Sequence, residues 1–328
     1  MVGGLLLAFA VLAALEVFLS SRGSRPSVKD NEKLWSHERR SLLHAGPEAL
    51  VLVGSSRMAL GFSPEGWQQE FPGQKIVQLA INGSSSLPLL QDLAGEPGFG
   101  GRVICEIEGW HLVGQEQTKA AQDYVDYYRK YWVSPFQDFE CLLRAKLQSR
   151  LALLREGVGY GEGLKNLWRG NGFKLKPYCI QVGVDRCMDA DYTRIDVRQQ
   201  EMTWLEHLES QTRLTQFTES QWLDRVRELK DSIRKIESRG GRVILVRFPT
   251  SGPLRVAEER AYPRERYWNR MVEGLAALHF EDVPSLRSFS CPEGSHLDAR
   301  DKVQFTAALA RELKNRHWPG RFRTGDNN

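Results

Sequence analysis

Residues 49–57 read Ala-Leu-Val-Leu-Val-Gly-Ser-Ser-Arg, so that a short apolar run ends in a glycine and is followed by two serines and an arginine. A continuous apolar run of this length is typical of a strand that is buried on both faces of a parallel sheet. Three further runs have the same character, at residues 76–81, 102–107 and 242–248. The sequence therefore predicts a parallel sheet whose first strand ends at Gly54.

Helical patterns lie between these predicted strands. Ser63 and Pro64 are typical of an N-cap and the first residue of a helix, and residues 87–94 predict a second helix. Apolar residues that recur every three or four positions predict one buried face of a longer helix, which Gly240 ends. They are Trp222, Val226, Leu229, Ile233 and Ile236. Strands and helices in alternation predict an α/β fold, a three-layer α/β/α, doubly wound parallel sheet of the flavodoxin-like type.

Composition narrows the class of protein. The 328 residues include 45 Lys and Arg against 41 Asp and Glu, a formal net charge of +4, which is too mild for a dedicated nucleic-acid binder. A hydrophobic content of 41% suits a large core and excludes bulk disorder. The five cysteines form no Cys-x-x-Cys pair, and no glycine-rich phosphate loop follows a predicted strand. We therefore expect neither a bound metal nor a cofactor.

The amino terminus predicts a membrane anchor over residues 1–20. Residues 2–19 are apolar except for Glu16, and eighteen helical residues span about 27 Å, against a hydrocarbon core of about 30 Å. A cleaved signal peptide and a soluble helix are the alternatives. The first usually carries a basic region and a small-residue cleavage site, and the second a polar face, and none of these features is evident. We expect a single-pass membrane protein.

The rest of the chain divides into a linker (21–46), a folded domain (47–317) and a basic tail (318–328). A stretch of about 112–218 interrupts the alternation of strands and helices and is interpreted as a helical insertion that caps the carboxyl ends of the strands. Its aromatic residues are expected to pack rather than to form a substrate platform. They are Tyr124, Tyr127, Tyr128, Tyr131 and Trp132.

Three segments carry residues suited to nucleophilic catalysis. Ser56 follows the first predicted strand, Asn82 and Gly83 follow the second, and Glu293 and His296 precede the last predicted helix. Ligands of open α/β sheets bind at the carboxyl ends of the strands, where the first two segments lie. Catalysis by a serine needs a hydroxyl, a base and a group that orients the base. We predict Ser56, His296 and Glu293 for these roles, with oxyanion donors at Asn82 and Gly83.

Four neighbouring residues have alternative roles. Ser55 is the alternative nucleophile. Asp298 is an alternative orienting carboxylate, although Asp298 followed by Ala-Arg-Asp also fits the N-cap of the last helix, so that Glu293 is favoured. His111 is either an accessory group or a packing residue. Arg57 is either a bidentate clamp for a substrate carboxylate or sugar acid, or a partner in a structural ion pair.

Taken together and in this order, the three segments resemble the SGNH/GDSL hydrolase superfamily, in which a Gly-Asp-Ser block follows the first strand and an Asp-x-x-His block precedes the last helix. The chain is most similar to the membrane-anchored branch that accompanies O-acylation of envelope or exported polysaccharides, whose first block often reads Gly-Ser-Ser-Arg. By position Ser56 matches the nucleophile, His296 the base and Glu293 the aspartate of the last block. Ser55 replaces the first-block aspartate, and residues 106–111 replace a Gly-x-Asn-Asp block.

The resemblance implies an SGNH hydrolase-type fold and a serine esterase or O-acyltransferase that acts on an acylated glycan or lipid. It also implies a membrane-bound acyltransferase as partner and a catalytic domain outside the cytoplasm. The basic residues that follow the apolar segment argue for the opposite orientation, because positive charge favours the cytoplasmic side. The absent third block keeps a second function open, a non-catalytic scaffold that binds a polysaccharide or a membrane partner.

Overall fold

The computed structural model describes residues 2–157, 160–170, 172 and 178–318. Its centre is a five-stranded sheet in the order β2-β1-β3-β6-β7, in which every neighbouring pair is parallel. The strands are β1 (Leu50–Val53), β2 (Ile76–Gln78), β3 (Arg102–Glu106), β6 (Arg242–Arg247) and β7 (Ala277–His279). Numbered within the sheet, this order is 2-1-3-4-5, which is the flavodoxin-like order. The predicted α/β class is confirmed, and β7 is a strand that the sequence pattern did not reveal.

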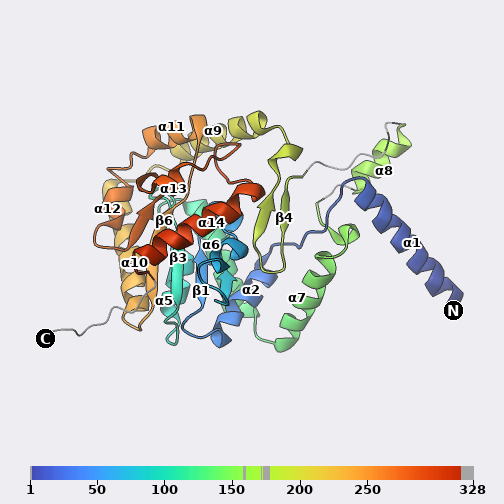
Figure 1. Ribbon diagram of the computed structural model, residues 1–328, viewed down its shortest axis with the longest axis horizontal. Coiled ribbons are helices and arrows are strands. Elements are labelled where there is room, and N and C mark those ends of the chain that lie inside the picture. The colour runs from blue at the N-terminus through green and yellow to red at the C-terminus, as the bar shows by residue number, and fades with distance from the viewer. Residues whose placement is uncertain (1, 158–159, 171, 173–177, 319–328) are drawn as a thin grey trace.

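Helices cover both faces of the sheet (Figure 1). Side chains alternate along a strand, so that Val51 and Val53 enter one core while Leu50 and Leu52 enter the other. The first core is completed by α2 (Glu32–Ser41), α5 (Leu87–Gly95), α6 (Gln115–Tyr131) and α10 (Glu219–Glu237). The second is completed by α3 (Ser56–Gly61), α4 (Pro64–Gln68), α13 (Pro284–Arg287) and α14 (Ala299–Asn315). The continuous apolar character of β1 follows from this burial on both faces.

Two predicted helix signals are visible in atomic detail. Ser63 Oγ accepts a hydrogen bond from the Gly66 N–H, and Pro64 is the first residue of α4. The predicted long helix is α10, and all five of its predicted apolar residues are buried.

The stretch 21–46, expected to be a linker, instead includes α2. This helix forms because Leu34 and Trp35 enter the cores and the Trp35 indole donates to Leu79 O at 2.9 Å.

The stretch from 112 to 218 holds α6, α7 (Pro135–Gln148), η2 (Ala152–Leu154), α8 (Tyr160–Trp168), an antiparallel pair β4 (Ile180–Val182) and β5 (Met188–Ala190), and α9 (Val197–Leu214). Only part of it caps the site. Helix α9 packs against α11 (Gly252–Ala261). Helix α6 instead packs against α2 and α5, in the helical layer that covers one face of the sheet. Tyr124 and Tyr128 pack edge-on against Trp35, at centroid distances of 6.2 and 6.1 Å.

Helix α1 (Val2–Ser21) extends away from the sheet, with the amino terminus at its far end (Figure 1). Almost all of its side chains are exposed. Its length and composition suffice to cross a membrane, and a signal sequence would meet the same criterion.

Candidate active site

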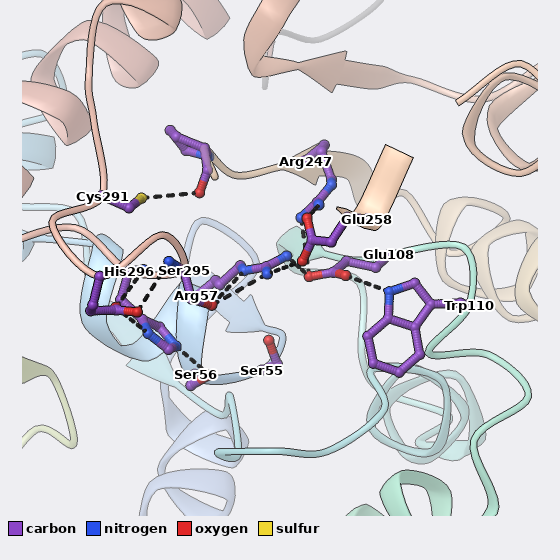
Figure 2. Close-up of polar contacts among 12 residues, drawn as sticks. Ser55, Ser56, Arg57, Glu108, Trp110, Arg247, Glu258, Cys291, Ser295 and His296 are labelled. Carbon is purple, nitrogen blue, oxygen red and sulfur yellow. Dashed lines mark hydrogen bonds and ion pairs between the residues drawn. The ribbon is translucent and has the colours of Figure 1, made fainter. Parts of the chain in front are cut away.

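Ser56, His296 and Glu293 form one chain of hydrogen bonds. The Oγ atom of Ser56 lies 2.8 Å from Nε2 of His296 (Figure 2). Nδ1 of the same ring lies 2.8 Å from Oε1 of Glu293. Ser56 is the first residue of α3 and is separated from the carboxyl end of β1 only by Gly54 and Ser55. Ser56 is half-buried, whereas His296 and Glu293 are buried. A hydroxyl, an imidazole and a carboxylate are thus in contact in the order that nucleophilic catalysis needs.

Asp298 holds the segment that carries the histidine. Its side chain caps α14 by accepting from the Arg300 N–H at 3.0 Å, and it also accepts from the Tyr192 N–H at 3.2 Å. Because α14 packs against α3 and α4, this cap sets the loop of His296 beside Ser56. Asp298 is therefore in the N-cap position, and Glu293 is the carboxylate that contacts the imidazole.

The carboxylate of Glu293 is kept ionised by its hydrogen bonds. Burial alone would raise its pKa, but the His296 ring, the Tyr192 hydroxyl and the Ser295 N–H donate to it, so that its pKa lies below the ordinary 4.5. Burial and the neighbouring charge of Glu293 raise the pKa of Tyr192, which keeps that hydroxyl protonated as a donor. Tyr192 was not predicted, because it lies in the interrupting stretch and carries no sequence signal.

The two serines of the first loop have different environments. Ser55 is buried, and its N–H and hydroxyl both donate to Oε2 of Glu106, at 2.8 and 2.9 Å. Gly54 is required before them, because a Cβ atom would lie 2.7 Å from Met58 Cβ and 2.9 Å from Glu106 Cβ. Both serines line the cavity, but Glu106 holds the hydroxyl of Ser55, whereas that of Ser56 contacts His296.

Of the two predicted oxyanion donors, Gly83 lies in the cavity and Asn82 does not. Gly83 lines the cavity beside Ser56 and has a φ of +67°, a conformation that favours glycine. Asn82 is exposed, and its amide donates to Met188 Sδ at 3.5 Å, so its side chain is engaged outside the cavity. The N–H of Ser56, at the start of α3, is a second backbone donor that a helix does not use internally.

His111 lines the same cavity as Ser56 and packs against Trp110, with ring centroids 4.0 Å apart. Burial, together with the charges of Arg57 and Arg247, lowers the pKa of His111 to about 3. The ring is therefore neutral near pH 7. The packing of His111 on Trp110 is observed, and its role as an accessory group stays a prediction.

Arg57 belongs to a buried ring of ion pairs (Figure 2). Its guanidinium contacts Glu108 and, at 2.5 Å, Glu258, and Arg247 contacts the same two carboxylates at 3.0 and 2.7 Å. Arg57 also donates to Ser295 Oγ at 3.3 Å, which links α3 to the histidine loop. The ion-pair interpretation of Arg57 therefore describes the structure, and its predicted role as a substrate clamp does not, because acidic side chains already occupy the guanidinium.

Two cavities of different size meet at this site. One of about 90 Å³ is lined by Ser56, His296, Gly83 and, from the cap, Trp204. One of about 810 Å³ adjoins it, since Glu108, Trp110 and Glu258 line both. Trp204 packs edge-on against His296 at 5.3 Å, a contact that the sequence did not indicate. Within the described ranges no three His, Cys, Asp or Glu side chains gather as a metal site.

No family model and no curated protein sequence matches the chain. Among solved structures it is similar to the crystal structure of TesA, at 15% identity and a TM-score of 0.32, over 82% of this chain and 99% of that one. So loose a superposition carries no functional argument. The fold class follows from the sheet instead. It is an α/β protein with parallel strands in the flavodoxin-like order and helices on both faces.

Proposed function

We propose that this protein is a membrane-anchored serine esterase or O-acyltransferase that acts on acyl esters of a cell-envelope or exported glycan. The observation that carries the proposal is the continuous contact from Ser56 through His296 to Glu293. A non-catalytic scaffold, which is the alternative function, would not need a partly accessible serine in contact with an imidazole. Ser56 is half-buried, whereas Ser55 is buried, and this difference favours the catalytic function over the scaffold.

In the proposed reaction His296 Nε2 takes the proton of Ser56 while Oγ attacks the ester carbonyl carbon. The N–H groups of Ser56 and Gly83 donate to the oxyanion that forms. When the intermediate collapses, the carbon–oxygen bond to the alcohol breaks, and His296 gives its proton to the leaving oxygen. Water or a sugar hydroxyl then attacks the seryl ester with the same base, which restores Ser56. Glu293 orients the ring and stabilises its protonated form throughout.

The two cavities support the proposed substrate class. The cavity at Ser56, about 90 Å³, is close to the volume of three water molecules at about 30 Å³ each, which suits a short acyl group. The adjoining cavity of about 810 Å³ is lined by charged and aromatic side chains, among them Arg247, Glu258 and Tyr262. A long acyl chain would need an apolar tunnel, whereas a polyhydroxylated alcohol finds donors, acceptors and ring faces in this wall.

Labelling with a fluorophosphonate tests the proposal. The full chain in detergent is expected to be labelled, and labelling is expected to be lost in Ser56→Ala and in His296→Ala. Ser55→Ala is the matched control, because it removes a neighbouring hydroxyl that contacts Glu106 and not the imidazole, while the Ser55 N–H still donates to Glu106 and holds the loop. Each variant is first checked by circular dichroism. A folded wild-type protein that resists labelling would support the scaffold instead.

Three further measurements separate the finer parts of the proposal. Hydrolysis of an acylated glycan with and without an added sugar acceptor distinguishes an esterase from a transferase by whether the acyl group reaches the acceptor. Co-purification with a membrane-bound acyltransferase would identify an acyl donor. A topology reporter that is active only outside the cytoplasm is fused to the carboxyl terminus, and we expect this reporter to be active.

A further inference from the structure

Helix α7 has two apolar faces. Cys141 and Ala145 are buried in a small core with Leu34 of α2, as expected for the inner face of a surface helix. The opposite face is apolar as well. Four large side chains recur on it at intervals of three, four and four residues: Phe136, Phe139, Leu143 and Leu147, which are 72, 62, 49 and 45% exposed. On a helix that faces water this side would be polar, so the stripe requires a partner.

Helix α7, which carries the stripe, is linked to the end of α1 through a shared neighbour. The short helix η2 packs against both α7 and α1. The carboxylate of Glu16, the only charged side chain of α1, accepts hydrogen bonds from the N–H groups of Ala152 and Leu153 at 2.8 and 2.9 Å. Helices α1, α7 and α8 gather at one end of the molecule, away from α10 and α12 (Trp268–Val272) (Figure 1).

The chain that leaves α1 is held by the folded domain. The Tyr178 hydroxyl and the Arg194 guanidinium donate to Gly23 O at 3.1 and 2.7 Å. Arg155 donates to Arg25 O at 3.0 Å and lies over the Tyr178 ring, 3.4 Å from its centroid. These contacts and those of Glu16 tie α1 to the fold at its carboxyl end. A membrane that α1 enters is therefore brought close to α7.

Charged and aromatic residues at the same end of the molecule fit a lipid headgroup layer (Figure 1). Helix α8 exposes Trp168 at 93%, and tryptophan is enriched at membrane interfaces. Lys165 and Arg169 flank it, and Lys146 and Arg150 occupy exposed positions on and after α7. Basic residues beside an exposed apolar face favour an interfacial position against anionic lipids.

We propose that the outward face of α7, together with the exposed residues of α8, lies in the interfacial layer of the bilayer that α1 enters, with phospholipid as its occupant. The proposal rests on the membrane anchor of the proposed function and is independent of the chemistry at Ser56. Its consequence is a folded domain that lies on the membrane surface at a defined angle, rather than one that swings on a single helix.

Site-specific photo-crosslinking tests this surface in the full chain. The photoreactive residue p-benzoylphenylalanine replaces Phe139, Leu143, Leu12 or Lys235 in separate proteins, each reconstituted in vesicles of phosphatidylcholine and phosphatidylglycerol at three to one. Leu12, 49% exposed on α1, reports the anchor, and Lys235, exposed on α10, is the solvent control. We expect phospholipid adducts at positions 12, 139 and 143, at least tenfold above position 235.

The arms distinguish the ways in which the proposal can fail. Adducts at position 12 with none above control at 139 and 143 would overturn the lipid surface and leave the anchor intact. Crosslinks from 139 or 143 to a second copy of the chain would also overturn it, because the stripe would then be a dimer interface. An absence of lipid adducts at position 12 would overturn the anchor and the surface together. Fluorophosphonate labelling of the same proteins reports independently on Ser56.

Discussion

Ser56 and His296 are 240 positions apart in the chain and are joined by a contact of 2.8 Å between Oγ and Nε2. The contact exists because β1 ends at Val53, a short loop before Ser56, while α14, which packs against α3, begins directly after the histidine loop. One side chain comes from the carboxyl end of a central strand and the other from a capped loop. Their separation along the chain therefore carries no information on their separation in space.

The first prediction is that Ser56 and His296 act together as one catalytic unit. Ser56→Ala and His296→Ala are each expected to lower kcat for a short acyl ester by about 10⁴-fold or more, since either change removes the activated nucleophile. The double variant is expected to be no slower than either single variant. Single-turnover kinetics of the three proteins would measure this. Losses that multiply in the double variant would show that the two side chains act independently.

Glu293→Gln is expected to lower kcat by about 10³- to 10⁴-fold, because a neutral amide no longer stabilises the protonated imidazole. The same variant carries a stability prediction. The pKa of Glu293 lies below 4.5 in the folded protein, so its carboxylate stabilises the fold above pH 4.5, and this contribution is lost as the pH falls through the folded-state value. The unfolding free energy of the wild type, measured in urea, should therefore decline below pH 4.5 more steeply than that of Glu293→Gln.

The ring of Arg57, Glu108, Arg247 and Glu258 is expected to be a stability element. Glu258→Ala would leave two buried guanidinium groups short of a partner and is expected to cost about 3 kcal/mol or more. Asp231→Asn is the control, because its ion pair with Arg234 is exposed and its loss is expected to change stability by less than about 0.5 kcal/mol. Urea unfolding at pH 7 compares the two. Equal effects would contradict a special role for the ring.

Substitution of His111 is expected to leave the pH dependence of activity unchanged. Since its pKa is lowered to about 3, the ring is neutral over the whole range from pH 5 to 8. His111→Gln keeps a neutral hydrogen-bonding side chain in the cavity. The pH profile of kcat/KM is therefore expected to keep its position on the pH axis even if its height falls. A displaced acidic limb would show that His111 titrates in that range.

Val256 lines the larger cavity and is 60% exposed. Val256→Trp would occupy space that the proposed function assigns to the alcohol of the substrate. KM for an acylated oligosaccharide is expected to rise at least tenfold more than KM for a p-nitrophenyl ester of the same acyl group. Leu214→Trp, at an exposed position at the end of α9, is the matched control. An equal rise for both substrates would place the alcohol elsewhere.

Local patterns sufficed for much of the fold and for part of the candidate site. Apolar runs are long and continuous where a strand is buried on both faces, as in β1, so they can be recognised without coordinates. N-caps such as Ser63 and Asp298 depend only on neighbouring residues, and both were recognised for that reason. Ser56, Glu293 and His296 were named because each follows or precedes a recognisable element.

Tertiary structure alone decided which residues meet. That Ser55 is held by Glu106, that Arg57 is enclosed by two carboxylates, and that Asn82 is engaged with Met188 depend on contacts between elements far apart in the chain. Tyr192 and Trp204 come from a stretch with no periodic signal, and folding brings them to Glu293 and His296. Sequence patterns record the local periods of helices and strands, whereas such contacts arise only when side chains from separate elements pack together.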